Sequence, residues 1–220
     1  MNLPGSVINP APNPISPQVR DAFMDVVTPH ISDNVSRSIG IGGLTRYHRS
    51  GKLVGTALTV KTRGGDNLLV YKAMTMIKPG HVLVIDAEGS LNNAVIGELI
   101  KLESLRRGCV GFIVDGAIRD VASFVDTPCY ARGVTHRGPY KDGPGEVNVP
   151  VFIGGQIVNP GDIVVGDEDG AVCFAPEFAD DLLALAARHA AKEHAIKRQI
   201  ASQAQDQTWF TDVLRQKGLM

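Results

Sequence analysis

Apolar residues in the middle of the chain occur in short continuous runs that are separated by turn residues. Runs of this length that are apolar throughout are typical of strands covered on both faces of a sheet. Between the runs, helical spacing predicts a short helix that begins at Asp66 or Asn67 and continues through Met76, and a second helix over 93–107 with Gly108 as its cap. The predicted strands are LVGTALTVKT (53–62), HVLVIDA (81–87) and CVGFIVDG (109–116).

The second helix connects two of these strands, which predicts a βαβ element with 81–87 and 109–115 as parallel neighbours. Residues 125–150 are rich in Gly, Pro and Thr and are expected to form loops or an edge strand. Short strands separated by turns follow at 149–155, 156–170 and 171–176, where they predict a compact β-rich layer.

The two ends of the chain differ from this pattern. The first 15 residues are rich in Pro and Asn and predict an irregular arm, after which Ser16-Pro17 begins a helix that is expected to end before Pro29. A long helix is predicted from Pro176 through Gln205, and its Ala-rich far part suggests an oligomer contact. We therefore divide the chain into an arm (1–15), a single α/β domain (16–176) and a C-terminal helix (177–220).

Composition narrows the class of protein. The chain has 220 residues, 44% of them hydrophobic, so it is long enough to bury one core. A net charge of −1 favours neither a nucleic acid nor a membrane surface as a partner. The start of the chain lacks the pattern of a signal peptide, so a cytoplasmic protein is expected.

The three cysteines and six histidines are scattered. Each cysteine (Cys109, Cys129, Cys173) lies in an apolar stretch, which predicts core packing rather than a thiolate metal site or a nucleophile. The closest histidines, His189 and His194, are five residues apart, a spacing that does not share one helix face. The spacing thus argues against a metal site made by these two residues.

The densest chemical signal is DGAIRD (115–120), which follows an apolar strand. Loops at the carboxyl ends of strands commonly bind ligands in α/β sheets, and Gly116 and Ala117 are expected to let the backbone turn there. Asp120 offers a hard oxygen ligand for Mg²⁺ or Mn²⁺, and Arg119 offers a planar fork that suits a carboxylate. The alternative is an ordinary surface ion pair without chemistry. The other acidic cluster, Asp167 and Asp169, is expected to form a turn.

A second candidate segment lies upstream at Gly97-Glu98-Leu99-Ile100. Glycine costs about 1 kcal/mol inside a helix relative to alanine, so Gly97 within the predicted helix indicates that something packs or binds closely there. Backbone N–H groups near a helix start can receive a carboxylate. Glu98 is alternatively an ordinary solvated helix residue.

The run GELIKLESLRRGCVGFIVDGAIRD (97–120) resembles class II pyruvate aldolases of the 4-hydroxy-4-methyl-2-oxoglutarate aldolase type, which share a fold with the regulator of ribonuclease activity A. Their pattern places an acidic residue before an Arg-Asp pair with twenty residues between, as Glu98 stands before Arg119 here. The resemblance extends through 55–74, 145–176 and 192–198. It implies an α/β fold, a layered ββα sandwich with a βαβ element and a long C-terminal helix.

The resemblance also implies roles for individual residues. Asp120 would be the direct ligand of a divalent metal cation (Mg²⁺ or Mn²⁺), and Arg119 would hold the pyruvate moiety together with the backbone of Gly97, Glu98, Leu99 and Ile100. Glu98 stands where these aldolases usually have aspartate, and with Arg119 it would hold the water that carries the proton. Glu193 matches a glutamate that reaches the site from a neighbouring subunit of a trimer or hexamer.

The implied reaction is the cleavage of 4-hydroxy-2-oxo acids, such as 4-hydroxy-4-methyl-2-oxoglutarate or 4-carboxy-4-hydroxy-2-oxoadipate, through a metal-stabilised pyruvate enolate. Oxaloacetate decarboxylation would use the same enolate. The alternative is a non-catalytic regulatory binding protein, because members of one fold can differ in function. A methyltransferase is not supported, since no glycine-rich strand-loop-helix with a following acidic residue occurs.

Overall fold

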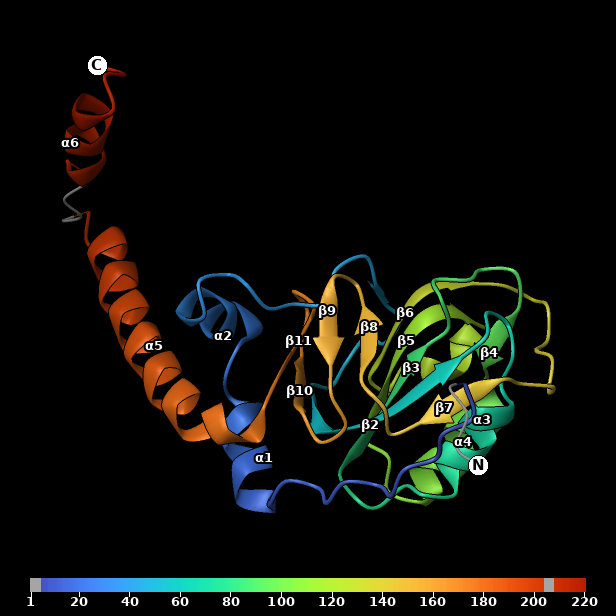
Figure 1. The fold of residues 1–220 in the computed structure, drawn as a ribbon. Coiled ribbons are helices and arrows are strands. Elements are labelled where there is room, and N and C mark those ends of the chain that lie inside the picture. Colours follow the sequence, from blue (N-terminus) through green and yellow to red (C-terminus); the bar gives the residue numbers. More distant parts are fainter. Residues whose placement is uncertain (1–4, 204–207) are drawn as a thin grey trace.

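A computed structural model describes residues 5–203 and 208–220. Its central feature is a set of four strands that pair in parallel, in the order β6, β5, β3 and β2 (Figure 1). The pairing of β3 with β5 confirms the predicted parallel neighbours. The four strands are β2 (Leu53–Thr62), β3 (His81–Asp86), β5 (Gly111–Ile118) and β6 (Cys129–Val134).

Antiparallel strands extend this set on both sides. Beyond β2 lie β10 (Ile163–Gly166) and β11 (Ala171–Phe174), and the short β1 (Thr45–Arg46) pairs with β6. Two further strands pair off this path, β7 (Gly145–Val147) with β2 and β4 (Ala94–Ile96) with β5. The segment 125–150 thus contains β6 and β7 between its loops.

Both faces of the parallel strands are covered, which explains why their sequences are apolar throughout. Successive side chains point to opposite faces. Leu83 and Phe112 pack in the core beneath α3 (Leu68–Met74) and α4 (Glu98–Arg106), whereas Val82 and Ile113 pack in a second core with the hairpin of β8 (Val151–Ile153) and β9 (Gln156–Val158). The result is a layered α/β fold of hairpin, sheet and helices, as predicted.

A third core joins the helices at the other end of the sheet to β10 and β11. Phe23, Ile31 and Leu182 are buried there, one from each of three helices. These helices are α1 (Pro17–Met24), α2 (Thr28–Asn34) and α5 (Ala179–Ala201), the last preceded by the 3-10 turn η2 (Pro176–Phe178). Asp167 attaches α2, because its carboxylate accepts bonds from the Thr28 backbone and hydroxyl, each 2.7 Å. It also accepts from Asp169 N, which confirms the predicted turn.

The first helix ends at Met24, before Pro29 as predicted, and Pro29 lies in the first turn of a separate helix, where the missing N–H of proline costs no intrahelical bond. Two other predicted helix boundaries were wrong. The helix predicted over 93–107 begins at Glu98, because 94–96 pair with β5 as β4. The long C-terminal helix ends at Ala201, and α6 (Trp209–Gln216) is a separate helix. Its predicted end, Gln205, lies outside the described residues.

The described part of the N-terminal arm, residues 5–15, contains no named helix or strand and is anchored to the sheet by hydrogen bonds. His81 holds it at Pro12: the ring Nε2 lies 3.1 Å from the Pro12 carbonyl, while Nδ1 accepts the Lys78 N–H. Since Nδ1 accepts, Nε2 carries the proton and the ring is neutral. Burial lowers the pKa of His81, and burial likewise lowers the pKa of His48.

Among the described residues, no helix has both the length and the apolar character that a membrane crossing requires.

We expect the protein to lose stability as the pH falls below about 6.5, because on unfolding His48 and His81 take up protons that they do not bind in the folded state. A pKa difference of one unit between the two states contributes about 1.4 kcal/mol. The urea midpoint measured across this range tests this. His81→Gln should flatten the dependence, whereas His194→Gln, at an exposed position, should leave it unchanged. An unchanged slope in His81→Gln would contradict the assignment.

Candidate active site

The two segments singled out in the sequence meet because β4 pairs in parallel with the end of β5. Ala94 lies opposite Ala117 and Ile96 opposite Ile118, and Arg119 N donates to the Ile96 carbonyl over 3.0 Å. The residues that follow each strand therefore emerge side by side. The short strand before the helix, which the sequence analysis did not predict, produces this convergence.

Asp120 takes a left-handed backbone conformation, φ 53°, which aspartate tolerates better than most residues. Its Oδ2 accepts the Glu98 N–H, at the start of α4, over 3.1 Å. The Arg119 Nε lies 3.6 Å from the same oxygen, and the two side chains are 41% and 46% exposed. The helix start thus holds one carboxylate oxygen, and the described residues give Asp120 Oδ1 no partner. A carboxylate oxygen is left open to solvent beside a guanidinium.

Gly97 is required by the close approach of these groups. The sequence analysis placed Gly97 inside the helix, but in the structure it has an extended conformation just before the helix begins. A Cβ at this position would lie 2.6 Å from Asp120 Oδ2 and 2.9 Å from Arg119 Cγ. The expected turn at Gly116 and Ala117 is also misplaced, since both are buried within β5 and the chain turns at 119–120. The presence of glycine at position 97 correctly indicated close packing, but the helix was the wrong secondary-structure element for this residue.

A cleft opens beside this junction. Asn67, at the start of α3, is the lining residue that sequence reasoning considered only as a helix cap. The residues lining the cleft are Asn67, Tyr71, Val95, Ile96, Gly97, Leu99, Ile100, Arg119, Asp120, Pro139 and Lys141.

The Asn67 side chain is buried, and its Nδ2 donates to the Val95 carbonyl over 3.1 Å. Its Oδ1 is buried without a hydrogen-bond partner, and Asp66 caps the helix in its place by accepting the Leu68 N–H. An unpaired buried acceptor costs about 1–3 kcal/mol.

Asp66 also anchors the loop that forms the other wall of the cleft. Its Oδ2 accepts the N–H groups of Asp142 and Gly143, at 2.7 and 3.0 Å. Burial alone would raise the pKa of Asp66, but the backbone bonds, together with Arg63, outweigh it and hold the pKa below its usual value. The carboxylate therefore stays charged and fixes the loop that carries Pro139 and Lys141.

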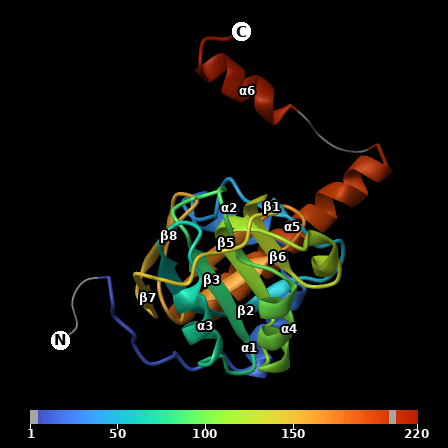
Figure 2. The same ribbon diagram turned by 90° about the vertical axis from the view of Figure 1, so that its right-hand side faces the viewer.

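The remaining predicted residues are placed differently. Glu98 contributes its backbone N–H, while its side chain is exposed. Leu99 is 73% exposed and lines the cleft with the buried Ile100. Glu193 lies on α5, on the opposite side of the molecule from α4 (Figure 1), and Figure 2 shows α3 and α4 toward the viewer with α5 behind the sheet. Within one chain, the structure does not bring Glu193 to Asp120.

The cysteines are structural, as predicted. All three are free and buried, and burial raises their thiol pKa values, that of Cys109 to about 11. A thiol with so high a pKa is a poor nucleophile at neutral pH.

Comparison with known proteins identifies the family of the chain. The RraA-like family, described as Aldolase/RraA, matches residues 28–173, and the chain belongs to this family. A Halalkalibacterium halodurans protein named "Putative 4-hydroxy-4-methyl-2-oxoglutarate aldolase" is 36% identical over 185 residues, which are 81% of this chain and 87% of the relative.

Solved structures show the same fold. The RNA-processing inhibitor RraA from Thermus thermophilis is 28% identical, with a TM-score of 0.63 over 69% of this chain and 93% of that one. An uncharacterized protein from Pseudomonas syringae pv. tomato is 24% identical, with a TM-score of 0.76 over 87% of this chain and 96% of that one. The family thus includes relatives named as aldolases and relatives named as inhibitors, and the choice between them depends on the site.

We expect Gly97→Ala to destabilise the protein by about 1–3 kcal/mol, because the added methyl group must displace Asp120 or Arg119. Urea unfolding measures the change. The matched control is the double variant Gly97→Ala/Asp120→Ala, in which the nearest contact is removed. If the contact with Asp120 is the cause, the two substitutions will cost less together than the sum of their separate effects. Additive costs would contradict it.

Proposed function

We propose that this protein is a divalent-metal-dependent aldolase that cleaves 4-hydroxy-2-oxo acids to pyruvate and a second oxo acid. The observation that carries the proposal is the half-exposed Arg119–Asp120 pair, held against the start of α4 at the mouth of a cleft. Membership in a family that includes a relative named as an aldolase supports it. A buried or fully paired Asp120 would have argued for a purely structural role.

The residues present fit Mg²⁺ or Mn²⁺. These ions need few protein ligands and retain several waters, so one accessible carboxylate oxygen from Asp120 is a sufficient direct contact. The second oxygen is held by the Glu98 N–H, which orients the ligand. When bound, the cation would supply stabilisation of the negative charge that develops on the 2-oxo group.

Arg119 is the residue that would hold the substrate carboxylate, because a guanidinium binds a carboxylate through two parallel hydrogen bonds. Lys141, across the cleft, adds positive charge for a substrate with further carboxylates. The proton of the C4 hydroxyl would leave through a water held by Arg119 and Glu98, since the cleft lining includes no histidine.

The substrates that fit this description are 4-hydroxy-4-methyl-2-oxoglutarate and 4-carboxy-4-hydroxy-2-oxoadipate, both of which leave pyruvate on cleavage. Oxaloacetate reaches the same enolate by losing CO₂, so a decarboxylase side activity accompanies the proposal. The proposal also includes a homo-oligomer, either a trimer or a hexamer, and a cytoplasmic location.

The second candidate function is regulation by protein contact without catalysis. The likeness to the Thermus RNA-processing inhibitor favours it, because that relative shares the fold and 28% of aligned residues. The two functions differ in one measurable property. An aldolase releases pyruvate from a 2-oxo acid in the presence of Mg²⁺ or Mn²⁺, whereas a regulator of this kind releases none with or without metal.

We expect Asp120→Asn to abolish metal-dependent release of pyruvate from oxaloacetate and from 4-hydroxy-4-methyl-2-oxoglutarate. Asparagine keeps an acceptor for the Glu98 N–H but loses the anionic oxygen that the cation needs, so the fold should be retained. A coupled pyruvate assay with and without Mn²⁺ measures the activity, and circular dichroism checks the fold. Asp126→Asn, at an exposed position nearby, is the matched control. Normal turnover in Asp120→Asn would refute the assignment.

The role predicted for Glu193 in a neighbouring subunit is tested by complementation. In its own chain, Glu193 is bonded to His30 and Lys197, so it would have to exchange these partners for a site on a neighbour. If it acts in that way, Asp120→Ala and Glu193→Ala are each inactive, and mixed oligomers regain part of the activity because some sites receive both native residues. Full activity in Glu193→Ala alone would remove this residue from the reaction.

A further inference from the structure

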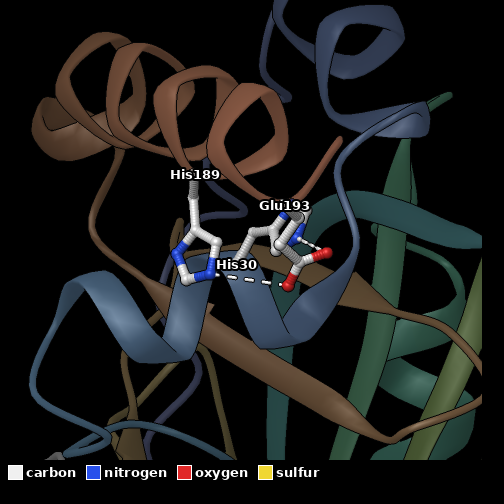
Figure 3. A group of neighbouring side chains, drawn as sticks. All are labelled: His30, His189 and Glu193. Atoms are coloured by element: carbon white, nitrogen blue, oxygen red, sulfur yellow. Dashed lines mark ion pairs between the residues drawn. The ribbon is translucent and has the colours of Figure 1, made fainter. Parts of the chain in front are cut away.

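Three metal-ligating side chains converge between α2 and α5, on the opposite side of the molecule from the candidate active site. His30 comes from α2, and His189 and Glu193 come from successive turns of α5 (Figure 3). Their ligating atoms all lie within 4.8 Å of one another. We propose that His30, His189 and Glu193 form a binding site for a divalent transition-metal ion of the zinc class. This inference does not rest on the proposed aldolase function.

The distances agree with those of a tetrahedral site. His30 Nε2 lies 3.3 Å from Glu193 Oε2, and His189 Nε2 lies 3.6 Å from Glu193 Oε1. In tetrahedral zinc the ligands are about 2.0–2.1 Å from the metal, which places neighbouring ligand atoms about 3.3 Å apart. An ion inserted between these atoms therefore requires only small side-chain movements.

The two helices provide a rigid frame. His189 and Glu193 are four residues apart, a spacing that places both side chains on one helix face. His30 faces them from α2, which Ile31 and the Asp167 bonds to Thr28 hold against the sheet. The rings of His30 and His189 are stacked, with centroids 4.6 Å apart. Both imidazoles thus direct Nε2 at the same carboxylate.

The chemistry of the ligands selects the ion. Two imidazole nitrogens and one carboxylate favour zinc and its transition-metal neighbours, whereas Mg²⁺ prefers oxygen ligands. Three protein ligands leave one coordination position open. The side chains of His30, His189 and Glu193 are 13%, 26% and 39% exposed, so an ion can enter and the open position faces solvent. A groove lined by His189, Glu193, Arg188 and Lys192 lies alongside.

The nearby lysine, Lys197, does not block the proposed metal site. Lys197 Nζ lies 3.3 Å from Glu193 Oε2, but the lysine side chain is 69% exposed and can move into water when an ion arrives. The bonds from His30 and Lys197 lower the pKa of Glu193, so its carboxylate is already in the charged form that a metal requires. The buried cysteines of the described chain do not compete for zinc, since burial keeps them protonated.

The proposal has a structural consequence. An ion at this position would link α2 to α5, which otherwise meet through the buried contacts of the third core. It would also hold Glu193 within its own chain. A Glu193 that binds this ion cannot at the same time serve a neighbouring subunit. The metal test below measures occupancy and not enzyme activity, so it is read separately from the complementation test.

The test is a calorimetric titration of the metal-free full chain with Zn²⁺ in excess Mg²⁺, which saturates oxygen-only sites. We expect one Zn²⁺ per chain, and Co²⁺ in its place should give the intense visible absorption of a tetrahedral ion. His189→Ala and Glu193→Gln should each weaken Zn²⁺ binding at least tenfold, because each removes one of three ligands. His194→Ala and Asp120→Asn should bind as the parent does.

Each result decides the question. Absence of Zn²⁺ binding to the parent, or equal affinity in the parent, His189→Ala and Glu193→Gln, would overturn the proposal. Weakened binding in Asp120→Asn would also overturn it, by placing the ion at the other site. The substituted side chains lie near the surface of α5, so folding is checked by circular dichroism. If a variant fails to fold, NMR of the histidine side chains in the parent decides: Zn²⁺ must shift the signals of His30 and His189 and leave His194 unchanged.

Discussion

The parallel pairing of β4 with the end of β5 is the constraint on which the candidate active site depends. The three-residue strand β4 (94–96) brings the start of α4 beside Arg119 and Asp120. A backbone hydrogen bond from Arg119 N to the Ile96 carbonyl holds the ends of β4 and β5 together. The Glu98 N–H can then hold Asp120, and a Cβ at position 97 would crowd the side chains of Arg119 and Asp120. Without this short strand the acidic and basic groups would belong to separate surface loops.

The rest of the fold supports this junction. The parallel strands are buried on both faces, so β5 delivers Arg119 and Asp120 from a rigid core. Asp66 performs a similar task on the opposite wall, where its charged carboxylate holds the backbone of the 139–143 loop. The cleft is thus formed by ordered elements on both sides, while the functional side chains remain accessible. This combination of rigid backbone and exposed polar groups is what a binding site requires.

Two clusters with different ligand chemistry lie at opposite ends of the molecule. The one at Asp120 offers carboxylate oxygen and suits a hard cation that keeps its waters. The one between α2 and α5 offers two imidazoles and a carboxylate and suits zinc. The proposed aldolase function rests on the first cluster. The second uses helices packed outside the hairpin, sheet and helix layers, so the two can vary independently.

Local sequence patterns were sufficient for the buried strands, the parallel neighbours and the core cysteines, because burial on both faces leaves a continuous apolar run that can be recognised without partners. They also indicated the tight packing at Gly97, and they singled out Arg119 and Asp120 as candidate site residues. They failed where a distant segment decided the outcome. Ala94–Ile96 form a strand because they pair with the end of β5, and the separate helix that begins at Thr28, which Asp167 anchors, was not predicted. The burial of the Asn67 side-chain oxygen and the contact of His30 with α5 both depend on residues that are far apart in the chain. Periodicity and spacing along the sequence do not predict such contacts. Their positions follow from packing alone, which is a property of the folded chain.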